Sequence, residues 1–319
     1  MTTRRFSAIA AGMVIAALLT GAASAAEVKL KAASFLPARV VYAKYFYSWV
    51  NEVNKRCAGK VKISVVGPAA IKSLEQWNAL KTGVIDMHFG PPNYYKGTMV
   101  EGDVTSLSNV SSAEQRKNGA WAIINELHNE RMNAWYLTHI IDGVKFFLYT
   151  SKPHENGRFE GFRLRSVPIY DAFFKSLGAQ PVRMAPPAVY TALERNIVDG
   201  YGWPLWGVTD FGWDKYTKYR HGPGFFSAVV NILVNLDRWN GLPDGHRKCL
   251  TDMAIWLEAE WPAWRAAEND TQLAGQEKAG IKYVDLGPNF PKTAHGLHWD
   301  ALMKANPEVI GKLRTLLVK

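Results

Sequence analysis

Apolar and polar positions in the first third of the chain follow the periods of a strand–helix–strand unit. The stretch 60–66 alternates and is rich in β-branched residues, which predicts a strand. Ser73 and Gln76 have the spacing of a capping box, so we expect a helix to begin there and to end at Gly83. The short apolar run 84–89 predicts a second strand directly after the helix.

The same order of elements returns in the second half of the chain. The stretch 162–167 is typical of a strand, a helix is expected through 190–195, and 197–201 predicts the strand that leads out of it. Because two separate regions predict one arrangement, the chain is expected to contain a duplicated α/β unit.

The two helix ends also match residue by residue. Segments 77–86 and 190–199 agree in register at an aromatic position, an Ala-Leu pair and a Val/Ile-Asp pair. Gly83 and Asn196 occupy the same place after the helix, where the backbone is commonly left-handed and these two residue types adopt that conformation most readily. We therefore expect two related lobes, with a ligand cleft where their strands end.

Further elements complete this frame. Apolar residues at helical spacing predict helices over 42–53 and 112–131. A long helical stretch runs from 243 to 278 and is long enough to bridge both lobes, although Pro262 inside it predicts a bend or a break. A last strand is expected over 281–286.

The N-terminus has the order of a secretory signal peptide. Arg4 and Arg5 precede an apolar run over 8–19, and the small residues 23–25 follow, with cleavage expected after Ala25. The paired arginines also leave a twin-arginine signal open as an alternative. No later segment has the roughly 20 consecutive apolar residues of a membrane-spanning helix. We expect an exported protein of the periplasm that is not embedded in the membrane.

Charge and cysteine content narrow the classes of partner. The formal net charge is +10, and removal of a leader with two arginines and no acids lowers it to +8. This balance favours anionic partners, but the basic residues are scattered rather than gathered in a stripe, which argues against nucleic acid. Cys57 and Cys249 are compatible with one disulfide in an oxidising compartment or with two unpaired buried thiols, and the sequence leaves both open.

Several motifs resemble the signature of DctP-type solute-binding subunits of tripartite ATP-independent periplasmic (TRAP) transporters. Order, spacing and residue types agree over essentially the whole mature chain, most clearly in four segments: Gly161–Pro168, Leu177–Val182, Val189–Leu193 and Val198–Gly200. The resemblance implies a small-molecule carrier that closes on one ligand and then docks on the membrane permease of a TRAP transporter. We expect no catalysis, and we identify no cofactor and no metal-ligating residues, while the sequence leaves open whether a metal ion binds together with the ligand.

The fold that the resemblance implies is a two-lobed periplasmic binding protein of the Venus-flytrap type, an α/β fold with a long helix crossing both lobes. The expected divisions of the chain are a signal peptide over 1–25, lobe I over 26–143 with a return over about 231–268, and lobe II over 144–230 with a return over about 269–319.

Arg165 is the residue on which the resemblance places the ligand. In this family, the arginine at this strand position usually forms a bidentate salt bridge with the substrate carboxylate. A guanidinium suits that role, because its planar fork matches two carboxylate oxygens and keeps its charge in a dry cleft. The alternative is an arginine on a half-buried strand that faces solvent.

Two departures from the family pattern bear on the ligand. Lys145 stands where many members have a second arginine, so it is either a second positive charge for the ligand or a solvated lysine. Trp203 replaces an asparagine in the loop before Pro204, which exchanges an amide for a large apolar wall. Other residues expected to line the pocket are aromatic: Trp206, Tyr190, Phe35 and Tyr94. Each is equally suited to a core, since the chain has 12 tryptophans. A small carboxylate with an apolar or aromatic body is favoured over a sugar acid, with a sulfonate as an alternative.

Two other functions remain as alternatives. An exported enzyme would lack the usual handles for nucleophilic, zinc and nucleotide chemistry, because the sequence has no Gly-x-Ser-x-Gly, His-Glu-x-x-His, Walker or Cys-x-x-Cys motif. His295 and His298 are spaced to share a metal ion but have no acidic motif beside them. A sensor that docks on a membrane receptor would use the same capture chemistry, so the sequence does not separate it from a transporter component.

Overall fold

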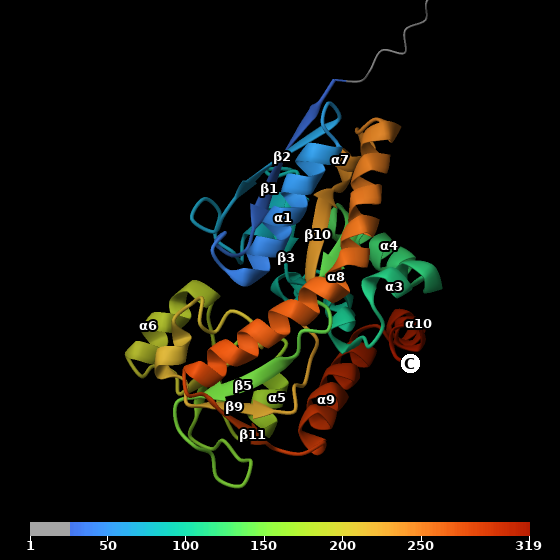
Figure 1. Ribbon diagram of the computed structural model, residues 1–319. Helices are drawn as coiled ribbons and strands as arrows, with labels where there is room; N and C mark the ends of the chain where they lie inside the picture. The colour runs from blue at the N-terminus through green and yellow to red at the C-terminus, as the bar shows by residue number, and fades with distance from the viewer. Residues whose placement is uncertain (1–25) are drawn as a thin grey trace, which may run out of the picture.

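The computed structural model describes residues 26–319, so the expected signal peptide lies outside the described residues. Figure 1 shows two α/β lobes, each built around one sheet, with a long helix running along both. This arrangement confirms the predicted two-lobed α/β fold.

The first sheet has the strand order β2-β1-β3-β10-β4. β1 pairs in parallel with β2 and β3, whereas β10 is antiparallel to β3 and β4. Its strands are β1 (Val28–Ser34), β2 (Val61–Val66), β3 (Met87–Gly90), β4 (Ala134–Ile140) and β10 (Val230–Asn235). The first lobe also contains α1 (Val41–Arg56), α2 (Gln76–Lys81), α3 (Ser112–Asn118), α4 (Ala120–Met132), α7 (Leu236–Asn240) and the 3-10 helices η1 (Pro92–Tyr95) and η2 (Val100–Leu107).

The second sheet has the strand order β11-β9-β5-β8-β6-β7. β6 pairs in parallel with β7 and β8, whereas β5 is antiparallel to β8 and β9. Its strands are β5 (Phe146–Thr150), β6 (Arg163–Ser166), β7 (Gln180–Arg183), β8 (Gly200–Pro204), β9 (Tyr219–Gly222) and β11 (Lys282–Asp285). The accompanying short helices are α5 (Asp171–Ser176), η3 (Pro186–Ala188), α6 (Val189–Glu194) and η4 (Trp213–Tyr216).

The duplicated unit predicted from sequence is present in both lobes. The order β2-β1-β3-β10 in the first sheet corresponds to β7-β6-β8-β5 in the second, with the same parallel and antiparallel pairings. Gly83 and Asn196 have φ values of 75° and 52°, which confirms the left-handed conformation expected of both. A local turn signal therefore identified equivalent places in two halves of the chain.

The aspartate shared by the two matched segments performs the same task in each lobe. Asp86 Oδ2 accepts a hydrogen bond of 2.7 Å from the backbone N–H of Lys31 in β1. Asp199 Oδ2 accepts one of 2.9 Å from the backbone N–H of Arg163 in β6. Each aspartate thus joins the helix–strand turn to the neighbouring strand, which sets Lys31 and Arg163 as equivalent positions.

The long helix α8 (Asp244–Lys278) crosses both lobes as one continuous helix. Pro262 lies inside it, and Figure 1 shows the helix changing direction along its length, so the predicted proline effect is a bend and not a break. Within residues 26–319, no helix is both long and apolar enough to cross a bilayer.

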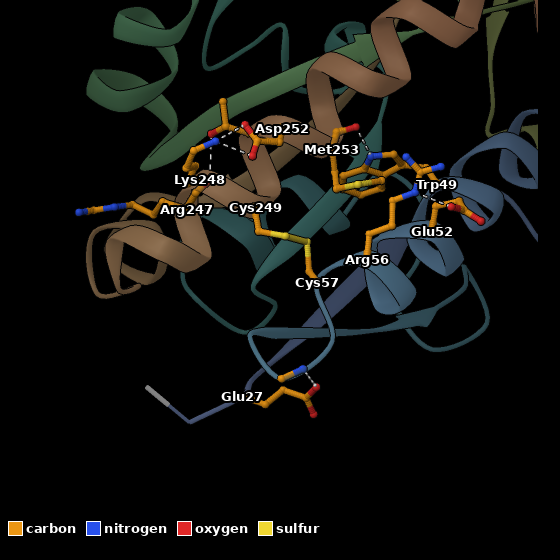
Figure 2. The surroundings of a disulfide bond; sticks show 12 residues. Glu27, Trp49, Glu52, Arg56, Cys57, Arg247, Lys248, Cys249, Asp252 and Met253 are labelled. Carbon is orange, nitrogen blue, oxygen red and sulfur yellow. Dashed lines mark hydrogen bonds and ion pairs between the residues drawn. A yellow bond between two sulfur atoms is a disulfide. The ribbon is translucent and has the colours of Figure 1, made fainter. Parts of the chain in front are cut away.

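A disulfide joins Cys57, just after α1, to Cys249 in α8, which settles the alternative that the sequence left open. The two Cα atoms are 6.0 Å apart although 192 residues separate the cysteines in the chain (Figure 2). Nearby, the Trp49 indole N–H donates to the carbonyl of Met253 at 2.9 Å. Together these contacts fix the first half of α8 to the first lobe.

The C-terminal helices differ from the expectation that residues 269–319 all belong to the second lobe. Helix α9 (Asn289–Ala305) contacts α5 of the second lobe and η2 of the first, and α10 (Pro307–Leu317) packs against η2, α4 and α3. Asn306 Nδ2 donates to Glu101 Oε1 at 2.6 Å, and this buried carboxylate anchors the start of α10 in the first lobe. The end of the chain therefore returns to the first lobe.

Two local expectations were wrong. Ser73 and Gln76 do not cap α2: the Ser73 hydroxyl donates to the Phe35 carbonyl at 2.8 Å, and Gln76 Nε2 donates to the Ser34 carbonyl at 3.0 Å. Both side chains are used to hold the loop after β1, so tertiary contacts replace the capping pattern. The helix expected over 112–131 is interrupted at Gly119, whose φ of 94° ends α3 and starts α4.

Candidate functional site

A cavity lies between the lobes, at the carboxyl ends of β1, β3, β6 and β8. The volume of this cavity is about 50 Å³, more than the roughly 10–15 Å³ that one water needs. Phe35 and Pro91 contribute to the lining from the first lobe, and Arg165 and Trp203 contribute from the second. This position is the one expected for a ligand site between related α/β units.

Arg165 supplies a buried positive charge to the cavity. Its side chain is 0% exposed on β6. Nε donates to the Met184 carbonyl at 3.1 Å and Nη1 to the Gly202 carbonyl at 3.2 Å. Nη2 has no hydrogen-bond partner, and no acidic side chain of residues 26–319 forms a salt bridge with this guanidinium. A buried cation without a counter-ion is costly, so a bound anion would stabilise it.

Aromatic side chains of the second lobe surround that charge. The Arg165 guanidinium lies 5.4 Å from the ring centre of Trp203, within the range of a cation–π contact. The Trp203 indole N–H donates to the Trp206 carbonyl at 2.7 Å, which fixes the ring in the cavity wall. Phe146 and Tyr170 line the same wall. The surface around Arg165 is therefore largely apolar.

The first lobe closes the cavity with aromatic and polar residues. The Phe35 and Tyr94 rings pack edge to face with centres 5.9 Å apart, and both line the cavity. Burial raises the pKa of Tyr94, and the nearby Arg165 opposes this rise. Asn93 also lines the cavity, and its buried Oδ1 has no hydrogen-bond partner. A ligand therefore meets a free acceptor, Asn93 Oδ1, on the first lobe and a free donor, Arg165 Nη2, on the second.

Asp103 is the acidic residue of the cavity lining. It lies on η2, is 1% exposed, and neither carboxylate oxygen has a hydrogen-bond partner. Lys96 Nζ is 3.4 Å from Oδ2, so the two side chains form an ion pair without good hydrogen-bond geometry. Burial raises the pKa of Asp103 to about 6, and the ammonium of Lys96 opposes this rise. The carboxylate is consequently ionised at neutral pH.

The structure brings together four of the seven residues predicted for the site: Arg165, Trp203, Phe35 and Tyr94. The other three lie outside the cavity lining. The Lys145 side chain is exposed. Trp206 is fully buried, stacks on Tyr42 and donates to Asn269 Oδ1 at 2.7 Å, which makes it part of the core beneath α8. Tyr190 packs edge to face against Tyr216, with ring centres 5.4 Å apart.

Sequence reasoning missed several residues that line the cavity. They come from α1, η1, η2 and the segments beside β6 and β10: Tyr42, Asn93, Asp103, Ser106, Tyr170 and Ser227. Tyr170 follows the Arg165 strand closely, so its place after a strand end was an available signal. Asp103 and Ser106 lie on a 3-10 helix, which produced no recognisable period in the sequence.

His295 and His298, considered above as metal ligands, pack on Phe226 with ring centres at 5.9 and 5.2 Å. The His295 Nε2 atom contacts the Phe225 carbonyl. Burial lowers the pKa of His298 to about 3, which keeps its imidazole neutral. No group of three or more His, Cys, Asp or Glu side chains suited to a metal ion occurs within residues 26–319.

Two lobes of related α/β topology, a helix that crosses both and a cavity between their strand ends define the class of two-lobed binding proteins. The family model "Bacterial extracellular solute-binding protein, family 7" (DctP) matches residues 32–294, and the chain belongs to this family. The resemblance noted in the sequence is thereby confirmed.

Two relatives match parts of this chain at low sequence identity. An uncharacterized protein of Haemophilus influenzae is 26% identical over 41% of this chain and 41% of its own length. A "Solute-binding protein" of Verminephrobacter eiseniae is 23% identical over 75% of this chain and 73% of its own length. The first of these matches thus spans less than half of the relative.

Two solved structures share the fold at low sequence identity. The solute receptor DctP7 of Bordetella pertussis, which binds pyroglutamic acid, has a TM-score of 0.78 at 15% identity and covers 90% of this chain and 99% of its own. A TRAP periplasmic solute-binding protein of Desulfovibrio salexigens with bound orotic acid has a TM-score of 0.80 at 16% identity and covers 91% and 98%. Both are similar to this chain over nearly its whole length.

Proposed function

We propose that this protein captures a small organic acid between its lobes in the periplasm and delivers it to the membrane permease of a TRAP transporter. The observation that carries the proposal is Arg165, a buried guanidinium with an unpaired Nη2 in a cavity between the lobes. A ligand carboxylate would supply the counter-ion that the protein does not. The family, and the organic acids bound by the two similar structures, support this class of ligand.

The walls of the cavity favour an acid with an apolar or aromatic body. Trp203, Phe35, Phe146 and Tyr170 present rings around Arg165. A sugar acid would bring several hydroxyl groups against these rings, where most of their hydrogen bonds to water would be lost without replacement. The ligand is therefore a compact carboxylate whose acid group faces Arg165 and whose body lies against Trp203.

Capture proceeds by closure of the two lobes on the ligand. A ligand that contacts both walls stabilises the closed arrangement by the difference in its affinity for the closed and open states. The closed form then presents both lobes to the permease. Export by the N-terminal leader would place the protein where the permease is accessible. Capture and release of the ligand require binding alone, without catalysis.

A thermal-shift screen of the ligand-free protein tests this function. Aromatic and keto carboxylates are expected to raise the melting temperature, since a ligand at 100 times its Kd stabilises the folded state by about 2.7 kcal/mol. Sugar acids, amines and neutral solutes are expected to leave it unchanged. Stabilisation by amines or neutral solutes alone would exclude an organic-acid carrier.

The same screen with two variants assigns the role to Arg165. Arg165→Ala should weaken binding of the best acid by at least about a hundredfold, because it leaves the buried carboxylate unpaired. Arg163→Ala is the matched control: it lies on the same strand, pairs with Asp199 at 3.2 Å and does not line the cavity. Its affinity for the acid should stay within about twofold of wild type.

A further inference from the structure

The cavity is lined by a negatively charged side chain as well as a positively charged one, which is unexpected in a site for organic anions. Asp103 lines the same cavity as Arg165 and is equally removed from solvent, at 1% exposed. An ionised carboxylate repels a carboxylate ligand unless another group stands between the two. The ligand must therefore offer something to Asp103 as well as to Arg165.

Asp103 is held rigidly where it meets the cavity. Every residue of η2 from Glu101 to Leu107 is buried. The Ser106 hydroxyl donates to the backbone carbonyl of Asp103 at 2.7 Å, and α9 and α10 pack against this helix. The backbone that carries the carboxylate is therefore fixed beside the cavity.

A comparison within the same helix shows that Asp103 lacks the partners of a structural acid. Glu101, also 1% exposed, accepts from Arg131 at 2.7 Å and from Asn306 at 2.6 Å, one on each oxygen. Asp103 has only the ion pair with Lys96, and both of its oxygens lack a hydrogen bond. Buried polar atoms of native proteins are hydrogen-bonded as a rule, so the exception points to a missing donor.

The charges around the cavity indicate which kind of donor fits. Arg165 and Lys96 are positive and Asp103 is negative, so one ligand carboxylate balances the set. A ligand ammonium group would leave a net positive charge in a buried site. A neutral N–H or O–H donor gives Asp103 its hydrogen bond and keeps the charges balanced.

We propose that Asp103 selects, among organic acids, those that carry a neutral N–H or O–H donor in addition to their carboxylate. The inference rests on the proposed function, because it assigns the carboxylate itself to Arg165. In the bound state, the ligand bridges the lobes: its acid group meets Arg165 of the second lobe, and its donor meets the Asp103 carboxylate of the first.

Two pairs of acids that differ in one donor test this selection by calorimetry. Pyrrole-2-carboxylate has an N–H where furan-2-carboxylate has a ring oxygen, and phenyllactate has a hydroxyl that 3-phenylpropanoate lacks. Wild-type protein should bind at least one donor acid about tenfold or more tightly than its partner, the typical effect of a hydrogen bond to a charged group. Equal affinities within both pairs, or no binding of any of the four, would overturn the proposal.

Variants then assign the selection to one residue. In Asp103→Ala the ratio of the two affinities should fall to about one, chiefly because the acid that carries the donor binds more weakly. Glu101→Gln, which neutralises a buried carboxylate of the same helix outside the cavity, should retain the wild-type preference. If Asp103→Ala does not fold, Asp103→Asn serves in its place, and its weaker acceptor should reduce the preference at least threefold. A preference that survives in the folded variant would overturn the proposal.

These outcomes separate the inference from the function on which it rests. If acids bind tightly, and this binding is lost in Arg165→Ala but unchanged in the Asp103 variants, the protein is an organic-acid carrier without donor selection. Failure of every carboxylate in the broader thermal-shift screen would instead contradict the proposed function itself.

Discussion

The two halves of the molecule share one frame but place different residues at its equivalent points. Asp86 accepts a hydrogen bond from the Lys31 N–H as Asp199 does from the Arg163 N–H, so Lys31 and Arg163 are equivalent. Two residues after them stand Ala33 in β1 and Arg165 in β6. Four residues after each aspartate, Gly90 in the first half corresponds to Trp203 in the second. The second half thus fills with a charge and an indole the positions that the first half keeps small.

The first half adds further cavity groups from residues outside the repeated unit. Asn93, Tyr94 and Asp103 lie on η1 and η2, which follow β3. The shared frame therefore fixes where the cavity lies, whereas the chemistry is added separately in each half. Ligand class is consequently decided by few residues and is free to differ between proteins of the same fold.

The first lobe also differs from the second in the number of histidines that it buries, and low pH should show their effect on stability. The first lobe buries His88, His128 and His139, and desolvation lowers their pKa values to about 3, 4 and 3. In the unfolded chain these imidazoles take up protons below about pH 6.5, but in the folded protein they do not. The unfolded state then binds more protons, so the free energy of unfolding decreases as the pH is lowered from about 6.5 to 4.

Two aspartates oppose this trend. The pKa values of Asp103 and Asp142 are raised to about 6 by burial, so between about pH 6 and 4 the folded state binds their protons. His221 and His298, both lowered to about 3, join the other histidines. Among the smaller shifts, the lowered pKa values of His154 and His295 outnumber the raised pKa of Asp210. The histidines therefore outweigh the aspartates and leave a net loss, at about 1.4 kcal/mol per pH unit for each uncompensated proton.

Denaturant titrations between pH 7.5 and 4.5 check this expectation. The free energy of unfolding should decrease steadily below pH 6.5. His88→Leu, which removes an imidazole that has no hydrogen-bond partner on either nitrogen, should reduce the slope by about 1.4 kcal/mol per pH unit. A stability that stays constant or rises with acid would contradict the assignment of neutral histidines to the first lobe.

The disulfide is a second asymmetry between the lobes. Replacing Cys57 and Cys249 with alanine should lower the free energy of unfolding by about 2–5 kcal/mol, since the bond closes a long loop in the unfolded chain. Reduction of the wild-type bond should lower it by a similar amount, which separates the cross-link from the lost side chains. The affinity for the organic acid should not change in either case. If removal of the disulfide leaves the free energy of unfolding unchanged, packing alone holds α8.

The Gly90 position tests how strictly the first half must stay small. A methyl group there would collide with the buried His88 ring, so Gly90→Ala is expected to destabilise the fold by about 1–3 kcal/mol. Gly97→Ala, where nothing lies within 4 Å of the added carbon, is the control and should be nearly neutral. Equal stability of the two variants in thermal melts would mean that the first half tolerates a side chain at this point.

The smallest effect is expected at Lys145, the charge that the sequence suggested as a second anchor. Its side chain is exposed and lies outside the cavity lining. Lys145→Met should change the Kd for the best acid by less than about twofold, measured at physiological ionic strength, where exposed charges are screened. A tenfold loss would bring this lysine into the site and weaken the contrast between one buried and one exposed cation.

Much of the frame was predictable because it depends on local signals. Helical and alternating periods, together with the residue types of Gly83 and Asn196, act over a few positions and produced the duplicated unit. The long helix was also visible, although whether Pro262 bends or breaks it depends on the packing on either side. Ser73 and Gln76 failed as a cap because distant backbone carbonyls compete for the same side chains.

The site was predictable where a motif marked it, at Arg165 and Trp203, or where an aromatic residue lay on a loop, at Phe35 and Tyr94. Arg165 and Trp203 belong to the repeated unit and were found, whereas Trp206 shares their neighbourhood in sequence but points into the core beneath α8. Asp103 was missed because the sequence does not show that Lys96 lies beside it, and because the cavity that it lines exists only after the lobes assemble. Composition does not distinguish a buried acid from the many exposed ones.

The chain passes between the lobes from β4 to β5, from β9 to β10, along α8 and again at α9. Two bodies joined by a single tether tumble independently, but bodies joined at several points keep little more than a rocking motion. Most of the orientational disorder between the lobes is thus removed when the protein folds, before any solute arrives. A small molecule with few contacts then has little disorder left to suppress, so even one acid group and one donor can hold it.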